Sequence, residues 1–197
     1  MIFRYAIATG RASYNPAPYL KGALATPVTK PYAAFHRVGL ADFLRKLDDY
    51  DGHPQTKFAL RLLALTFVRT GELRGAEWTE FDLDGAMWRI SAERMKMRAL
   101  HHVPLARQAV AMLKELQALN GDGRLLFPSQ ISREKSMSEN TVLYVLYGMG
   151  YHGRATGHGF RATASTLLNE MNWKPDVIER QLAHTEKNKV RAAYHRA

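Results

Sequence analysis

Residues 155–197 read ATGHGFRATASTLLNEMNWKPDVIERQLAHTEKNKVRAAYHRA, and the interpretation of the whole chain starts from this stretch. It holds a fixed cation, Arg161, two imidazoles, His158 and His184, and a phenol, Tyr194. His158 and Arg161 are three positions apart, so on a helix their side chains share one face. Arg161 could hold two phosphate oxygens with its planar fork. Tyr194 could supply an oxygen nucleophile that forms a covalent intermediate.

Each of these side chains also has an ordinary structural explanation. His158 could begin a helix, Arg161 could be a solvated charge, His184 a loop residue and Tyr194 a buried aromatic. Taken singly, those explanations are the better ones. The hypothesis of a phosphodiester site therefore depends on further residues upstream.

Two upstream segments supply such residues. Residues 70–78, TGELRGAEW, place Arg74 and Glu77 three positions apart on a short polar helix that follows an apolar one. Residues 94–98, RMKMR, form a basic turn around Lys96. On charge alone that turn is typical of a solvated loop.

In this order the residues resemble the tyrosine recombinases, and in particular the phage and genomic-island integrases. The resemblance covers about Phe58 to Tyr194. Any one motif is weak, and the ordered set is strong. The set runs Arg74, Lys96, His158-x-x-Arg161, His184 and Tyr194.

The resemblance implies a fold and a set of roles. The fold is α+β, mainly helical with a small three-stranded antiparallel sheet, as in the DNA breaking-rejoining catalytic domain. Arg74 and Arg161 would stabilise the phosphate, and Tyr194 would attack it. His158 would act as the base and Lys96 as the acid. His184 would donate a hydrogen bond to a phosphate oxygen, and Glu77 would support the arginine from behind. Arg94 and Arg98 would contact the DNA backbone.

The same resemblance implies the reaction and its partners. The product would be a 3′-phosphotyrosyl link with a free 5′-hydroxyl, which conserves bond energy and needs no cofactor. Partners would be double-stranded attachment sites, a homotetramer on DNA for the full-length protein, and excision and host accessory proteins. The absence of a clustered carboxylate set predicts no metal.

Composition agrees with a nucleic-acid partner. Lys and Arg number 28 against 18 Asp and Glu, so the formal net charge is +10. Such an excess favours DNA backbone binding, although an anionic membrane or an acidic protein would also suit it. The cysteine count is 0, which excludes disulfides and thiolate chemistry. No apolar run reaches membrane length. We expect a bacterial cytoplasmic protein associated with the nucleoid and not with a membrane.

Proline density in residues 15–34 predicts an extended linker. The resemblance then implies that residues 1–34 are the last helix of a core-binding domain followed by this linker, and that residues 35–197 are a catalytic domain truncated just after the nucleophile. Helices are expected near 40–50, 54–67, 108–119, 140–147, 175–182 and 187–197, and the helix that the His158 motif opens is expected to continue over 161–171. Asp84-Gly85 predicts a hairpin between strands near 81–83 and 87–90, and a third strand at 102–105 contains Pro104, typical of an edge. We expect this fragment to be weak or inactive alone.

Three alternatives remain beside recombination. A type IB topoisomerase-like enzyme would nick and religate with the same chemistry but without paired sites. A DNA-binding module without catalysis would keep the charge and lose the reaction. A histidine-based metalloenzyme has little support, because His101 and His102 on one strand would point to opposite faces.

Overall fold

The computed structural model describes residues 2–20, 22–23, 25 and 33–184. The chain divides into two compact units, Met1–Pro31 and Tyr32–Ala197. The first unit contains helix α1 (Ile2–Ala8) and the short 3-10 helix η1 (Ala17–Leu20). Gly10 follows α1 with a left-handed backbone, φ 69°, a conformation typical of the residue after a helix.

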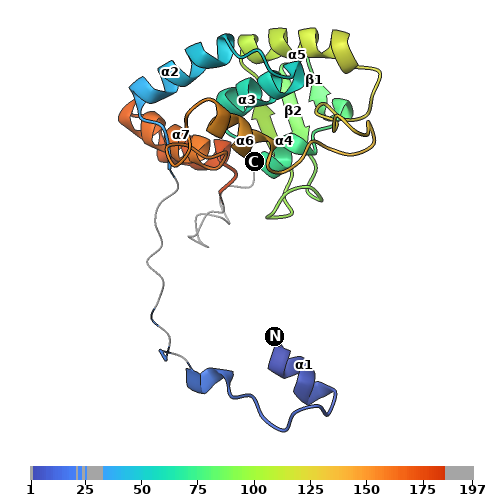
Figure 1. Ribbon diagram of the computed structural model, residues 1–197, viewed down its shortest axis with the longest axis vertical. Coiled ribbons are helices and arrows are strands. Elements are labelled where there is room, and N and C mark those ends of the chain that lie inside the picture. The colour runs from blue at the N-terminus through green and yellow to red at the C-terminus, as the bar shows by residue number, and fades with distance from the viewer. Residues whose placement is uncertain (1, 21, 24, 26–32, 185–197) are drawn as a thin grey trace. The chain divides into compact units, whose positions relative to one another are not determined.

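The second unit is mainly helical and carries one small sheet (Figure 1). This confirms the predicted fold class. The expected helix 187–197 lies outside the described residues. In chain order the elements are α2 (Arg37–Asp48), α3 (Pro54–Thr66), α4 (Thr70–Arg74), η2 (Trp78–Glu80), β1 (Phe81–Asp82), β2 (Met87–Ile90), β3 (His101–Pro104), α5 (Arg107–Asn120), α6 (Thr141–Gly148), α7 (Gly159–Glu170) and α8 (Pro175–Gln181).

Helix α3 is the centre of this unit. Leu60, Leu62 and Leu63 are all fully buried, whereas Leu65 is exposed. It packs against α2, α4, α5 and α6, which surround it (Figure 1). Pro54 occupies the first turn, where its missing N–H costs nothing. Phe67 ends the helix in a left-handed conformation, φ 56°, and redirects the chain toward α4.

The three strands form an antiparallel sheet in the order β1-β2-β3. Side chains alternate along β2, where Trp88 and Ile90 are buried and Arg89 is exposed. The β1–β2 hairpin is closed by Asp82, whose Oδ1 accepts a hydrogen bond of 2.8 Å from the Gly85 N–H. Pro104 lies on the edge strand β3, as predicted. β3 begins at His101, one residue before the expected start.

An aromatic cluster joins the beginning of the larger unit to α7. Phe35, which precedes α2, lies 5.1 Å from Phe43 of α2 and 5.4 Å from Phe160 of α7 between ring centroids. Tyr151 closes the cluster at 5.2 Å from Phe35. The Phe35 N–H also donates a 2.9 Å hydrogen bond to the hydroxyl of Thr163 in α7. These contacts fix α7, the helix that carries Arg161, against the core.

No helix in the described part of the chain combines the length and the apolar content needed to cross a bilayer.

Candidate active site

The corner between α3 and α4 places Arg69 at the surface of the core. Arg69 is the residue before α4 and has an extended backbone (φ −71°, ψ 147°). It forms a capping box with Glu72 in the first turn of the helix. The Glu72 carboxylate accepts the Arg69 backbone N–H at 2.8 Å and pairs with the guanidinium Nη1 at 2.7 Å. The Glu72 side chain is only 4% exposed, against 23% for that of Arg69. A buried carboxylate therefore fixes the arginine from behind.

Arg161 lies beside Arg69 and is buried, with 4% of its surface exposed. Its Nη1 donates to the Phe67 carbonyl at 2.8 Å, and its Nη2 donates to the Leu182 carbonyl. Burial and then the neighbouring charge of Arg69 lower the pKa of Arg161 to about 10, partly offset by Glu72. At neutral pH the guanidinium remains positively charged. Two guanidinium cations are thus held next to each other, an arrangement suited to a phosphate.

His158 precedes α7 and belongs to the same group. Burial lowers the pKa of His158, and the charges of Arg161 and Arg69 lower it further. The pKa is also lowered, more weakly, by His184 and then by Lys96. A lowered pKa keeps the imidazole neutral near pH 7, the form that can accept a proton.

The turn after α8 places His184. Its N–H donates to the Glu179 carbonyl at 2.9 Å, and its Nδ1 lies 2.8 Å from the Glu179 carboxylate. The turn itself is held by the arginines, because Arg69 Nη2 donates to the Ala183 carbonyl at 3.2 Å and Arg161 donates to that of Leu182. Ala183 has a left-handed backbone, φ 47°. The arginines therefore position the segment that presents His184.

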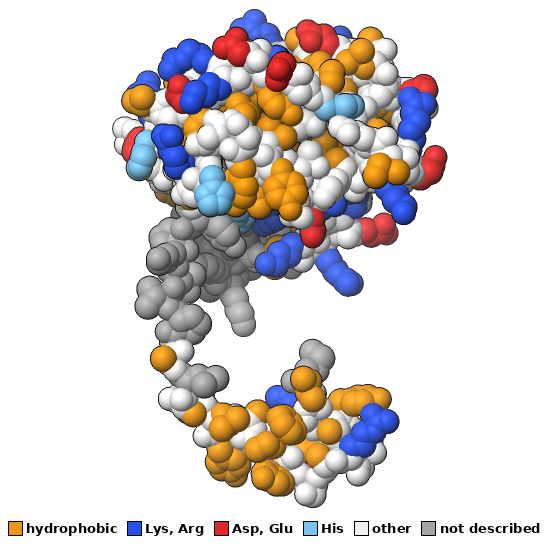
Figure 2. All heavy atoms as spheres, in the orientation of Figure 1, with side chains coloured by type: hydrophobic (Ala, Val, Ile, Leu, Met, Phe, Trp, Pro, Cys, Tyr) orange, Lys and Arg blue, Asp and Glu red, His pale blue; other side chains and the backbone are white. Residues whose placement is uncertain are grey.

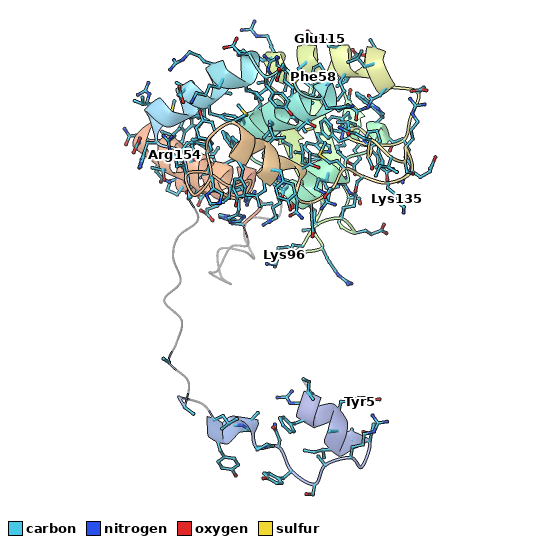
Figure 3. The ribbon with its side chains drawn as sticks, in the orientation of Figure 1. Tyr5, Phe58, Lys96, Glu115, Lys135 and Arg154 are labelled. Atoms are coloured by element: carbon cyan, nitrogen blue, oxygen red, sulfur yellow. The ribbon has the colours of Figure 1, made fainter. Side chains whose placement is uncertain are left out.

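Lys96 comes from a different element, the loop between β2 and β3. Figure 3 shows Lys96 where this loop projects beyond the strands. The preceding residue, Met95, is 4% exposed and anchors the loop in the core. The positive charge of Lys96 contributes to the lowered pKa of His158, after the larger contributions of burial, the two arginines and His184.

Arg74 does not join this group. Its Nε donates to the Met137 carbonyl at 2.8 Å, so the structure directs its side chain toward the segment before α6. Arg69 occupies the position that the sequence analysis gave to Arg74. The signal was present, because Arg69 and Glu72 have the same three-residue spacing as Arg74 and Glu77. The physical reason for the correction is the chain reversal at Phe67, which points the start of α4 toward Arg161.

Glu77 and Arg94 also have other partners than expected. Glu77 pairs with Arg124, away from the arginines, and Glu72 has the supporting position instead. Arg94 pairs with Glu80 and donates to the Glu72 carbonyl at 2.5 Å, so its guanidinium is engaged within the protein. Arg98 is exposed, as a DNA contact requires. Tyr194 lies outside the residues that the structure describes.

His101 is a neighbour of the site that the sequence analysis missed. It is 7% exposed, whereas His102 is exposed, so the two rings do point to opposite faces of β3. Burial lowers the pKa of His101; Glu72 raises it, and Arg161 and Arg69 lower it. The strand pattern alone could have indicated an inward histidine. Among the described residues, no three His, Asp or Glu side chains come together as a metal site.

Comparison with known proteins then identifies the family. The family model described as "Phage integrase family" matches residues 41–197, which is most of the chain. The chain belongs to the phage integrase family. The integrase of Enterobacteria phage P4 is 44% identical over 98% of this chain, and prophage integrase IntS of Escherichia coli (strain K12) is 37% identical over 100% of it.

Solved structures show that this integrase-family chain has the fold of known recombinases. The lambda integrase tetramer bound to a Holliday junction matches 95% of this chain and 56% of its own, with 18% identity and a TM-score of 0.68. XerA recombinase matches 100% of this chain and 82% of its own, with 19% identity and a TM-score of 0.63. The chain spans about half the length of the curated relatives, 47% of the P4 integrase and 51% of IntS.

Proposed function

We propose that the protein to which this chain belongs performs site-specific DNA recombination, the integration and excision of a prophage or genomic island. The observation that carries the proposal is that Arg69 and Arg161 both bond to the turn that presents His184. The charges of these two arginines, of His184 and of Lys96 also lower the pKa of His158, after burial. The relatives in the same family are named integrases of phages and prophages.

The proposed reaction is a transesterification at phosphorus. The Tyr194 hydroxyl oxygen forms a bond to phosphorus, and the bond from phosphorus to the 5′-oxygen breaks. His158 accepts the phenolic proton, and the ammonium group of Lys96 gives a proton to the departing 5′-oxygen. The product is a 3′-phosphotyrosyl link with a free 5′-hydroxyl, and attack by a 5′-hydroxyl reverses it.

The arginines supply charge stabilisation in this scheme. Arg69 and Arg161 bind the non-bridging oxygens, whose negative charge grows as the attacking oxygen adds. Glu72 holds Arg69 in place. His184 uses Nδ1 toward Glu179, so Nε2 is the ring nitrogen that faces a phosphate oxygen. Arg98 on the Lys96 loop contacts the DNA backbone.

The partners are attachment-site duplexes, further copies of the protein in a tetramer, and excision and host accessory proteins. One solved relative is described as a tetramer bound to a Holliday junction, which supports the tetramer. The basic excess of Lys and Arg over Asp and Glu suits a DNA backbone. Blue side chains are spread around the larger unit in Figure 2. Such a protein would act at the bacterial nucleoid.

Covalent capture tests the proposal without knowledge of the attachment site. The intact protein is incubated with a pool of duplexes that are randomised in the centre and nicked near it, so that cleavage releases a short strand and traps the adduct. Denaturation in detergent retains only linked DNA, which is then sequenced. We expect a defined sequence to be enriched, and Tyr194→Phe to abolish capture. Relaxation of supercoiled plasmid without joining of two enriched sites would indicate a topoisomerase-like enzyme instead.

A further inference from the structure

Arg94 lies in the same loop as Lys96 but points the other way. Successive turns fold residues 91–98 tightly, with the Arg94 N–H donating to the Ser91 carbonyl at 3.1 Å and the Arg98 N–H to the Met95 carbonyl at 3.0 Å. The Arg94 side chain turns inward and is 22% exposed, and that of its partner Glu80 is 11% exposed. The pair is thus more enclosed than most ion pairs of the chain.

Glu80 is itself held by two further donors. The indole Nε1 of Trp88 donates to its Oε2 at 3.0 Å, and the Glu77 backbone N–H donates to the same oxygen at 3.3 Å. The Arg94 guanidinium also rests on Gly75, where an added Cβ would lie 3.0 Å from Nη2. Both ends of the ion pair are therefore fixed.

The second bond of Arg94 leads directly to the arginine site. Arg94 Nη2 donates at 2.5 Å to the carbonyl of Glu72, the residue whose carboxylate pairs with Arg69. One residue, Glu72, therefore connects Arg94 through its backbone and Arg69 through its side chain. Buried Met95 holds the loop on the other side of Arg94. Lys96 follows directly after these two anchors.

We propose that Arg94 is a positioning residue that sets the ammonium group of Lys96 relative to Arg69. This inference rests on the proposed function, in which Lys96 protonates the departing 5′-oxygen. Loss of Arg94 releases one of the two anchors and lets the lysine move away from that oxygen. Arg161 keeps its bonds to the Phe67 and Leu182 carbonyls, and Arg69 keeps its pair with the Glu72 carboxylate, because Arg94 bonds only to the Glu72 backbone.

A change of leaving group tests this. A 5′-bridging sulfur in place of oxygen departs as a thiolate, and because a thiol has a pKa of about 8.5 it needs no proton from an acid. The variant is Arg94→Met with Glu80→Gln, which leaves no unpaired charge. The matched control is Arg124→Met with Glu77→Gln, which removes the other Arg–Glu pair beside η2. The probe is the duplex enriched by covalent capture, made with oxygen or with sulfur at the cleaved position.

We expect the Arg94 variant to cleave the oxygen substrate roughly 10- to 100-fold more slowly, part of the 10²–10⁴ that a general acid contributes. On the sulfur substrate its rate should return to near that of the unmodified protein. Lys96→Ala should show the same recovery. The Arg124 variant should match the unmodified protein on both substrates.

Equal slowing on both substrates, or no slowing on either, would overturn the assignment. A failure of the proposed function gives a different result, because the unmodified protein would then form no adduct or Lys96→Ala would not recover with sulfur. If the Arg94 variant does not fold by circular dichroism, Gly75→Ala replaces it. Gly75 has φ −89°, which alanine adopts, so its Cβ disturbs only the Arg94 guanidinium. The same preference for sulfur is expected there, with a smaller effect.

Discussion

Arg69 and Arg161 carry two like charges into a partly buried place. Burial, and after it the repulsion between the two cations, lowers the pKa of Arg161 to about 10, and the charges of Glu72 and Glu179 offset part of this decrease. A phosphate between the two guanidinium groups would relieve the repulsion. The site is therefore prepared for an anion before any anion arrives.

The clearest residue-scale prediction separates Arg69 from Arg74. Arg69→Lys should slow adduct formation on the captured duplex by roughly 10²–10³, the loss typical of one donor to a developing charge, because lysine cannot bind two oxygens with a planar fork. Arg74→Lys should stay within a few-fold of the unmodified protein, since Arg74 contacts the Met137 carbonyl. The opposite ranking would return Arg74 to the site.

A second residue-scale prediction concerns acid stability. Burial lowers the pKa of His101 and of His158 in the folded state, whereas in the unfolded chain both titrate near 6.5. Between that value and the lower folded pKa, only the unfolded chain binds the protons, so the free energy of unfolding falls as pH decreases. Urea unfolding at pH 7 and pH 5.5 measures this. His101→Gln should make the loss smaller; an unchanged loss would show that His101 does not contribute.

Sequence could not decide between the two arginines of this corner. Arg69 with Glu72 and Arg74 with Glu77 have identical spacing, and which pair faces Arg161 depends on the left-handed turn at Phe67. The inward direction of Arg94 depends likewise on Glu80, a partner fourteen positions away. The prediction of His158, Arg161, His184 and Lys96 depends on their order in the chain, which is informative without coordinates.

At the scale of elements, the start of α7 depends on two glycines that flank His158. A Cβ at Gly157 would lie 2.4 Å from Thr70 Cγ2, and one at Gly159 would lie 2.0 Å from the Ala33 carbonyl. The loop can therefore approach α4 on one side and residues 33–35 on the other. His158 reaches the arginines because its neighbours have no side chains.

Gly157→Ala should move this loop away from α4. We expect slower adduct formation and a lower unfolding temperature, because the Thr70 methyl group and the new Cβ cannot occupy the same space. The additional substitution Thr70→Ser removes that methyl group. It should restore most of the rate of adduct formation and most of the unfolding temperature. Gly148→Ala is the control, since a Cβ at the end of α6 meets nothing within 4 Å. If Thr70→Ser does not improve the Gly157→Ala variant, contact with the Thr70 methyl group is not the cause of the loss.

The elements themselves were largely predictable. Leucine spacing indicated α3, Asp84-Gly85 indicated the hairpin, and Pro104 indicated an edge strand, because each depends on local chemistry. Helix α7 begins at Gly159, directly after His158, which the sequence offered as a possible helix start. Glycine is a poor helix former, and the Ala33 carbonyl leaves no room for a larger residue at this position.

At the scale of the larger unit, the aromatic cluster joins residues more than a hundred positions apart. Phe43 is fully buried and lies 5.3 Å from Phe160 and 5.8 Å from Tyr151 between ring centroids. Phe43→Ala should lower the free energy of unfolding by about 3–5 kcal/mol, the range for a deleted core aromatic. Val38→Ala in the same helix is 79% exposed and should change it by less than about 0.5 kcal/mol. Urea titration of both variants measures the difference, and equal effects would contradict this account of the core.

The bonds from Arg69 and Arg161 to the Ala183 and Leu182 carbonyls have a practical consequence. Each arginine is both a charge and a tether between distant parts of the chain, so an alanine scan would merge two separate losses into one number. Free guanidinium added to such a variant can refill the vacated charge but cannot reconnect the backbone. The portion of the rate that this chemical rescue leaves unrecovered would measure the tether alone.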